Sequence, residues 1–495
     1  MNALLVGFNA SSSEFFTEHL SSRFDRVLVI YDDADTHENK GKEDLHRLRS
    51  GDFYSGNLPN ASDVLEEASV PFWSEAHIVA MKMLGRQGRD PFSINFEERN
   101  AFFCACWRYA QGYIQDNHVS VIIFRTIPHF AFEYILMEVA RSLGIRCLSK
   151  EDVFPLNASY LIDLHDRQKQ LDYMPPSASR VELEATSEKI DSFILKQTDD
   201  TQVEHPAYFQ ENRNAALFNR KPFKLFWDFC VDVAAIILRF NRKKYVSLVH
   251  KNRYGICFNE TASELSWRWA KWLARFGAIE NSKAYRKLAP NAPAPGGMLV
   301  VTNYQPERTT IPDCGVYGDL LTFVDLVVSS TKVDEDILFK EHPSCFNFPI
   351  EYFYRGYLFR SPRIYRALSE YKSLSFIPED VPVDAYLKSC HTVIGQSSSV
   401  IYQASMLGKK AICFAPTWFA GCSLVHYVQS EEDYRAALAA PHPDKNETKG
   451  IWRAYLNGMA PFLFPMTDLR HVAEGTHMSF LNHMLALLDH LSDTA

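Results

Sequence analysis

The stretch Ile337-Leu338-Phe339-Lys340-Glu341-His342-Pro343 decides the fold class, because a short apolar run ends abruptly in a polar cluster. Two other runs end in the same way, at Ile377-Pro378-Glu379-Asp380 and at Gly395-Gln396-Ser397-Ser398-Ser399. Short runs rich in Val, Ile and Leu are typical of buried parallel strands. Ligands of open α/β sheets bind at the carboxyl ends of the strands, so these three junctions predict one shared ligand site.

The first part of the chain shows the same kind of pattern. Apolar runs at 4–8, 26–31 and 119–124 predict strands, and the periodic segment 130–143 predicts a helix that ends at Gly144. Strands that alternate with helices predict a Rossmann-like domain. The loop after the first run, residues 7–13, lacks the G-x-G-x-x-G spacing, so it does not support a dinucleotide.

A linker divides the chain in two. Residues 288–297 hold three prolines and two glycines in ten positions, which excludes a helix or a central strand there. Runs at 298–302, 336–340, 373–377, 392–395 and 411–414 then predict a second parallel sheet. We therefore predict an α/β protein of the GT-B architecture, in which two Rossmann-like domains face each other across a cleft. The predicted domains are 1–290 and 296–440, and residues 441–495 form a helical segment that can cross back to the first domain.

Composition narrows the class of protein. A net charge of −8 argues against a nucleic-acid binder. The ten cysteines include no C-x-x-C pair, which is typical of reduced cysteines in a cytoplasmic protein. The sequence has no basic signal-peptide region after Met1 and no apolar run of about 18 residues, so neither secretion nor a membrane span is predicted. We expect a cytoplasmic protein.

Residues 213–253 form a basic segment with a helical pattern. They contain ten Lys or Arg and two Asp or Glu, a local charge of +8. Apolar side chains recur at helical spacing from Phe223 to Ile237, and Lys224, Asp228 and Asp232 fall on the opposite face. Two interpretations remain open. The helix can pack on its own domain, or it can lie on an anionic surface such as the inner membrane, with the protein peripheral there.

The polar junctions contain the residue types that bind phosphate. Ser397, Ser398 and Ser399 precede a helical segment, so one of them is expected to cap the helix and the cluster can also bind a phosphate. His342, held by Pro343, can donate a proton or a hydrogen bond to a leaving phosphate oxygen. Lys340 and Glu341 either complete that site or form a solvated charge pair.

Two carboxylates are further candidates. Glu307 follows the strand predicted at 298–302 and can act as a base or as a nucleophile at an anomeric carbon, or it is a turn residue. Glu379 can accept hydrogen bonds from a ribose, or it is a carboxylate at a helix N-terminus.

Three segments together resemble the capsule polysaccharide biosynthesis family, which includes the bacterial β-Kdo transferases and, more distantly, sialyl- and polysialyltransferases. They are Gln305-Pro306-Glu307, Lys340-Glu341-His342-Pro343, and Gln396-Ser397-Ser398-Ser399 with Gly408-Lys409-Lys410. The resemblance covers residues of about 298 to 425, and Pro128-His129 extends it weakly. It departs from the family at Glu307-Arg308-Thr309, where Kdo transferases often show consecutive acidic residues.

The resemblance implies a GT-B glycosyltransferase of capsule or lipopolysaccharide O-antigen synthesis. Its donor would be a CMP-activated acidic sugar, Kdo first, and its acceptor a glycan or lipid-linked glycan bound by the N-terminal domain. No metal or other cofactor is expected. Alternatives are a sialyltransferase, a CDP-glycerol-type glycerophosphotransferase, and a non-catalytic partner of polysaccharide assembly. The implied catalytic residues are Glu307 and His342, and the implied donor-binding residues are Gln305, Lys340, His342, Pro343, Glu379, Gln396, Ser397, Ser398 and Ser399.

Overall fold

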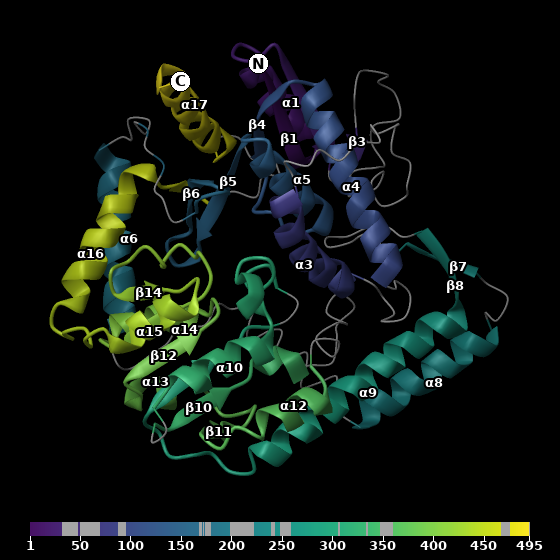
Figure 1. Ribbon diagram of the computed structural model, residues 1–495, viewed down its shortest axis with the longest axis vertical. Coiled ribbons are helices and arrows are strands. Elements are labelled where there is room, and N and C mark those ends of the chain that lie inside the picture. Colours follow the sequence, from purple (N-terminus) through teal and green to yellow (C-terminus); the bar gives the residue numbers. More distant parts are fainter. Residues whose placement is uncertain are drawn as a thin grey trace.

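The computed structural model contains two α/β domains, each built around one sheet (Figure 1). It describes residues 1–31, 48–49, 70–87, 96–167, 171, 173, 180–198, 222–238, 243–247, 259–304, 307–332, 335–346, 360–466 and 476–494. The prediction of an α/β chain with two Rossmann-like domains is confirmed by the topology of the two sheets.

The N-terminal sheet has the strand order β15-β6-β5-β4-β1-β2-β3. Strands β1 to β5 are parallel to one another, whereas β6 is antiparallel to β5 and β15 is antiparallel to β6. The order reverses between β1 and β4, as in a Rossmann sheet. The strands are β1 (Asn2–Phe8), β2 (Arg26–Tyr31), β3 (Leu48–Arg49), β4 (Val119–Phe124), β5 (Arg146–Val153), β6 (Ala158–Asp163) and β15 (Phe464–Pro465).

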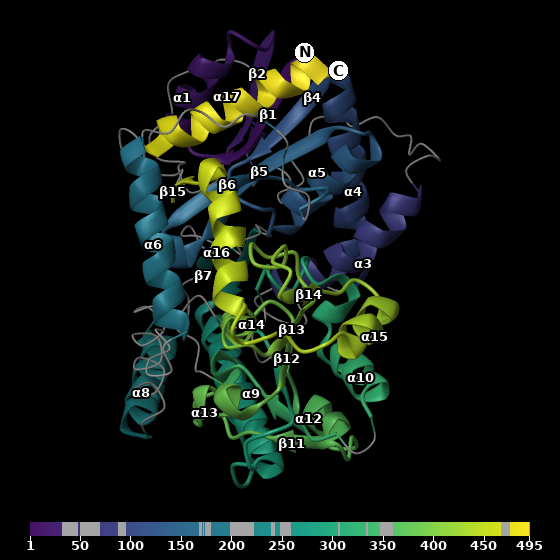
Figure 2. The ribbon, with the colours of Figure 1, turned by 90° about the vertical axis from the view of Figure 1, so that its left-hand side faces the viewer.

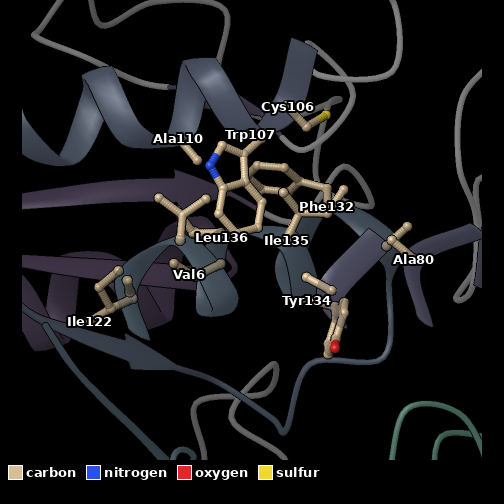
Figure 3. Close-up of a cluster of buried hydrophobic side chains, with 14 of the residues drawn as sticks. Val6, Ala80, Cys106, Trp107, Ala110, Ile122, Phe132, Tyr134, Ile135 and Leu136 are labelled. Carbon is tan, nitrogen blue, oxygen red and sulfur yellow. The ribbon is translucent and has the colours of Figure 1, made fainter. Parts of the chain in front are cut away.

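Helices cover both faces of this sheet, because alternate residues of its central strands point to opposite sides. Leu4 and Val6 pack under α3 (Val70–Gln87), α4 (Phe96–Asp116) and α5 (Ala131–Ser142), where Trp107 of α4 points toward α5 (Figure 3). Ala3 and Leu5 pack under α1 (Ala10–Leu20) and α17 (Thr476–Thr494). Helix α5 ends before Gly144, whose φ of 69° is the left-handed conformation that terminates helices.

The C-terminal sheet is parallel throughout, with the order β11-β10-β9-β12-β13-β14. Its direction of progression reverses between β9 and β12. The strands are β9 (Met298–Val301), β10 (Ile337–Lys340), β11 (Leu374–Phe376), β12 (Thr392–Gly395), β13 (Lys410–Cys413) and β14 (Val425–Tyr427). The helices beside them are α10 (Leu320–Ser330), α12 (Pro362–Leu368), α13 (Asp384–Ser389), α14 (Ser399–Met406) and α15 (Glu431–Ala439).

The end of the chain returns to the N-terminal domain. Helix α16 (Thr448–Met459) lies beside α6 (Arg180–Thr198), and α17 lies across the N-terminal domain (Figure 2). Between them, β15 joins the N-terminal sheet. Trp452 of α16, Phe193 of α6 and Leu156 belong to one buried cluster with residues of the C-terminal sheet, so the two domains share part of a core.

A hairpin unit connects α6 to the C-terminal domain. It consists of α8 (Pro222–Leu238), the antiparallel strands β7 (Lys243–Ser247) and β8 (Asn259–Ser263), and the long helix α9 (Glu264–Leu288). Helices α8 and α9 run side by side at one edge of the molecule (Figure 1). Of the basic segment 213–253, residues 213–221, 239–242 and 248–253 lie outside the described residues.

Candidate functional site

Asn303 and Ser397 meet where the strand order of the C-terminal sheet reverses. Asn303 follows β9 and Ser397 follows the neighbouring strand β12. The Asn303 Nδ2 atom donates to Ser397 Oγ over 2.6 Å, and the Ser397 backbone N–H donates to Asn303 Oδ1 over 3.1 Å. Such a switch point is where open α/β sheets bind ligands. The sequence prediction missed Asn303, because nothing in its neighbourhood distinguishes it from an ordinary loop residue.

Glycine is required beside this pair. A Cβ atom on Gly395 would lie 2.8 Å from Val301 Cγ2 and 3.1 Å from the Val301 carbonyl oxygen. Because β9 and β12 pair at this point, a side chain there would push the two strands apart. Gly395 therefore sets the close approach that lets Asn303 reach Ser397.

The serine run begins helix α14. Ser398 is the N-cap, and its Oγ accepts a hydrogen bond from the Val400 N–H. Ser399 is exposed in the first turn, and Ser397 is buried against Asn303. Gln396 is buried and its Nε2 donates to the Tyr317 carbonyl over 2.6 Å. The run thus supplies a cap, a link between loops, and an exposed hydroxyl beside a positive helix end.

His342 lies after β10, on the other side of β9 from the serines. Its backbone N–H donates to Thr302 Oγ1 over 2.9 Å and to Glu341 Oε1 over 3.1 Å, which holds the backbone of the loop. The ring lies 6.1 Å from the Tyr304 ring. Burial lowers the pKa of His342 to about 4, although nearby Glu341 opposes the shift. The imidazole is therefore neutral at pH 7 and offers one N–H donor.

Glu341 is an internal residue rather than part of a solvated pair. Its side chain is fully buried and binds Arg360 through two hydrogen bonds of 2.6 and 3.1 Å. Thr302 and Tyr365 also donate to this carboxylate. Burial acts to raise the pKa of Glu341, but Arg360 and the hydrogen bonds hold it below its usual range. The alternative of a solvated Lys340–Glu341 charge pair is wrong, because Glu341 is buried and paired with Arg360.

Lys340 and Glu379 both make contacts within the protein. The Lys340 ammonium is buried and donates to the carbonyl oxygens of Pro378 and Glu379, which ties the end of β10 to the loop after β11. The Glu379 carboxylate accepts from Ser282 and Arg286 of α9. Helix α13 begins only at Asp384, so the alternative of a helix N-terminal carboxylate does not describe Glu379. Both residues shape the loop beside His342, and their contact with a donor remains a prediction.

Glu307 begins a loop that reaches the N-terminal domain. The residue is exposed at the surface, yet the protein atoms around its carboxyl group still remove enough water to raise the pKa to about 7. Hydrogen bonds from Thr309 and Asn303 and the nearby Arg308 oppose that shift. A carboxyl group of this pKa can accept a proton near neutral pH. Gln305 and Pro306 lie outside the described residues, and Pro343 is exposed at the start of a 3-10 turn, Pro343–Phe346.

Buried ion pairs fix this loop against the first domain. Asp313 binds Arg308 of the loop and Arg167 of the N-terminal domain, over 2.5 and 2.9 Å. Arg167 also binds Glu151 of β5 over 3.1 Å. Ile311 of the loop belongs to the buried cluster that contains Ile127, just after β4. The loop that carries Glu307 is thus held by both domains.

The N-terminal sheet has its own charged cluster at its switch point. The register of β1 with β2 shifts at Gly7, whose φ of 78° is in the left-handed region. A Cβ atom on Gly7 would lie 3.3 Å from Glu133 Oε1 and 3.8 Å from Arg125 Nε. Arg125 follows β4 and Glu133 lies in the first turn of α5; both are buried. The His129 N–H donates to Glu133 over 3.5 Å. The sequence prediction named Gly7, in the loop 7–13, and His129, but neither Arg125 nor Glu133.

No metal cluster is present in the part of the chain that the structure describes: no three His, Cys, Asp or Glu side chains gather there as ligands.

Comparison with known proteins gives only loose structural similarity. No protein-family model and no curated protein sequence matches the chain. Methanocaldococcus jannaschii UDP-GlcNAc 2-epimerase in complex with UDP-GlcNAc and UDP aligns with a TM-score of 0.23 and 11% identity, over 92% of this chain and 98% of that one. The wall teichoic acid polymerase TagF aligns with a TM-score of 0.20 and 9% identity, over 99% and 90%. Acinetobacter baumannii MurG aligns with a TM-score of 0.17 and 8% identity, over 97% and 98%.

The chain has the GT-B fold. This assignment rests on two Rossmann-type sheets and a C-terminal segment that returns to the first domain, rather than on the low TM-scores. Each domain has a switch point in its sheet, with Arg125 and Glu133 in the first domain and Asn303 and Ser397 in the second. The loop 307–313 lies between the two domains.

Proposed function

We propose that this protein is a glycosyltransferase of bacterial surface polysaccharide synthesis, capsule or lipopolysaccharide O-antigen. It would transfer an acidic sugar, Kdo, from CMP-Kdo to a glycan or lipid-linked glycan. The observation that carries the proposal is the Asn303–Ser397 contact at the switch point, with the start of α14 and His342 on either side of β9. The contact positions the start of α14, whose N–H groups and Ser399 hydroxyl are hydrogen-bond donors. A CMP phosphate is an acceptor that gains negative charge during transfer.

The proposed step breaks the bond between the anomeric carbon and the phosphate oxygen of the donor. An acceptor hydroxyl forms the new bond to that carbon, and its proton passes to Glu307, whose pKa of about 7 suits a base at neutral pH. CMP leaves with one additional negative charge on its phosphate. The exposed Ser399 hydroxyl, the N–H groups at the start of α14 and one N–H of neutral His342 would stabilise that charge.

The acceptor would approach from the N-terminal domain. Arg125 and Glu133 at its switch point offer a buried cation and a carboxylate for sugar hydroxyls or an acidic sugar. The loop 307–314 contacts this domain through Arg167 and Ile311, so an acceptor bound there would lie on the Glu307 side of the donor site. A metal ion has no role in the proposed step.

A donor panel tests the proposal. The protein is incubated with CMP-Kdo, CMP-sialic acid, CDP-glycerol or UDP-GlcNAc and a matched acceptor for each, and product and free nucleotide are measured. We expect transfer from CMP-Kdo. Transfer from another donor would show that CMP-Kdo is not the substrate, and it would leave the proposed donor site in place. Binding of CMP without transfer or hydrolysis of any donor would favour a non-catalytic assembly partner. Absence of CMP binding at about millimolar concentration would overturn the site itself.

A further inference from the structure

Helix α8 packs against α9 through its polar face. Asp232 is buried, and its carboxylate binds Arg268 and accepts from Trp272 Nε1 of α9, the latter over 3.0 Å. One turn earlier Asp228 binds Arg275 of α9 over 2.8 Å. The contact face of α8 is therefore the face that carries its charges, and the usual arrangement of an amphipathic helix is inverted.

The apolar stripe of α8 consequently faces outward. Phe226, Trp227 and Ile237 keep 67%, 59% and 71% of their surface exposed. The surface continues onto α9, where Phe276 is half exposed and its ring contacts Trp272, which in turn contacts Phe229 of α8. We call these residues the α8–α9 apolar face: Phe223, Phe226, Trp227, Phe229, Ile237, Leu238, Leu273 and Phe276. A set of exposed aromatic and aliphatic residues this extensive marks an interaction site.

Charge distinguishes between possible occupants of this face. The segment 213–253 carries ten basic and two acidic residues, and the acidic two are Asp228 and Asp232. Arginines of α9 pair with both carboxylates, so neither acidic residue of the segment is left uncompensated. An apolar helix face in a stretch of sequence this rich in basic residues complements the surface of an anionic bilayer. A symmetric contact with a second copy would instead bring like charges together.

We propose that the α8–α9 apolar face inserts into the surface of an anionic lipid bilayer and holds the protein there as a peripheral protein. No helix in the described part of the chain is long and apolar enough to cross a membrane, so this contact would lie in the interface. The apolar side chains enter the headgroup boundary while the basic residues contact lipid phosphates. This proposal needs no transferase activity, and its failure would leave the donor site unaffected.

Vesicle co-sedimentation tests the proposal with the full chain. The wild-type protein should bind phosphatidylcholine vesicles that contain phosphatidylglycerol, and bind much less to phosphatidylcholine alone or at high salt, because screening weakens charge attraction. The variant Phe226→Ser/Trp227→Ser should lower the partition coefficient at least about tenfold, since each aromatic group contributes a large buried apolar area. Lys243→Gln/Lys244→Gln should weaken binding only to the anionic vesicles.

The matched control is Phe154→Ser. Phe154 is 68% exposed and lies in the turn after β5, far along the chain from α8, so its loss should leave vesicle binding unchanged. Equal binding of wild-type protein to neutral and anionic vesicles, or no binding to either, overturns the proposal without reference to any variant. Concentration-dependent dimerisation that disappears in Phe226→Ser/Trp227→Ser, without vesicle binding, would assign the face to a second copy instead.

Discussion

Asn303 and Ser397 exchange two hydrogen bonds across the point where the C-terminal sheet reverses its strand order. The amide of Asn303 uses its nitrogen to donate to the Ser397 hydroxyl and its oxygen to accept from the Ser397 backbone. Each bond fixes the orientation of the other, so the loops after β9 and β12 cannot move independently. Ser398 and Ser399, which begin α14, are positioned by this contact.

A double-mutant cycle tests that coupling. Asn303→Ala removes both bonds and should weaken CMP binding about tenfold, whereas Ser397→Ala keeps the bond from its backbone N–H and should weaken binding about fivefold. The double variant should be scarcely weaker than Asn303→Ala, because that change already removes the whole contact. Isothermal titration calorimetry with CMP gives the coupling energy, which we expect at about 1–2 kcal/mol. Ser389→Ala is the control, because the hydroxyl of that serine donates to the Ala385 carbonyl within its own helix, α13. Strictly additive losses would show that the two loops bind ligand independently.

The raised pKa of Glu307 predicts the pH dependence of transfer. A base must be ionised, and its ionised fraction grows as pH rises through a pKa of about 7. The value of kcat/KM should therefore increase about tenfold between pH 6 and pH 8 and then level off. Glu307→Gln should abolish transfer and spare CMP binding. A flat pH profile in the wild type, or wild-type turnover in Glu307→Gln, would assign the base to another residue.

The neutral state of His342 predicts proton uptake when CMP binds. Burial holds its pKa at about 4, and a phosphate dianion beside the ring would raise that pKa again. By linkage, acidification below neutral pH should favour CMP binding to the wild type relative to His342→Ala, and the variant should lose part of the proton uptake. Calorimetry in buffers of different ionisation enthalpy measures this uptake, and Glu307→Gln removes the carboxyl group of the site whose pKa is about 7.

His342→Ala should also lower turnover by about two to three powers of ten, the loss expected for one anion-stabilising group. The backbone N–H of His342, which makes the bonds to Thr302 and Glu341, is unchanged in this variant. His391→Ala is the control, because that imidazole is exposed and binds Glu335. Unchanged turnover in His342→Ala would remove the imidazole from the site.

The sequence predicts where the strands end but not what the long side chains contact. Apolar runs locate β10 and β12, and Gly395 with the serines identifies the start of α14, because these signals are local. The sequence alone does not distinguish Lys340 and Glu379 from residues that bind a ligand, because both lie where a predicted strand ends. Their actual partners, the 378–379 carbonyls and Arg286, are distant in the chain and are brought together only by the sheet and α9.

Helix α8 shows a second limit of the same kind. Its periodicity correctly predicts an amphipathic helix, but periodicity cannot say which face meets the protein. The arginines of α9 that pair with the carboxylates of α8 lie farther along the chain, Arg268 36 residues after Asp232 and Arg275 47 residues after Asp228. Helix α8 does pack on the protein itself, against α9, but its charged face makes this contact and its apolar face is exposed. Contact with an anionic surface stays a prediction.

The buried pair of Glu341 and Arg360 provides the last prediction. Both side chains are almost fully inaccessible, so removing one charge leaves the other uncompensated in the interior. Glu341→Gln or Arg360→Met should each lower the free energy of unfolding by about 3–5 kcal/mol, whereas Glu341→Gln/Arg360→Met should recover much of the loss. Chemical denaturation followed by tryptophan fluorescence measures the change. The exposed pair Glu431–Arg435 is the control, and Arg435→Met should cost less than about 1 kcal/mol. Equal effects at the two pairs would mean that solvent reaches Glu341, and its place as an internal support of the His342 loop would then be lost.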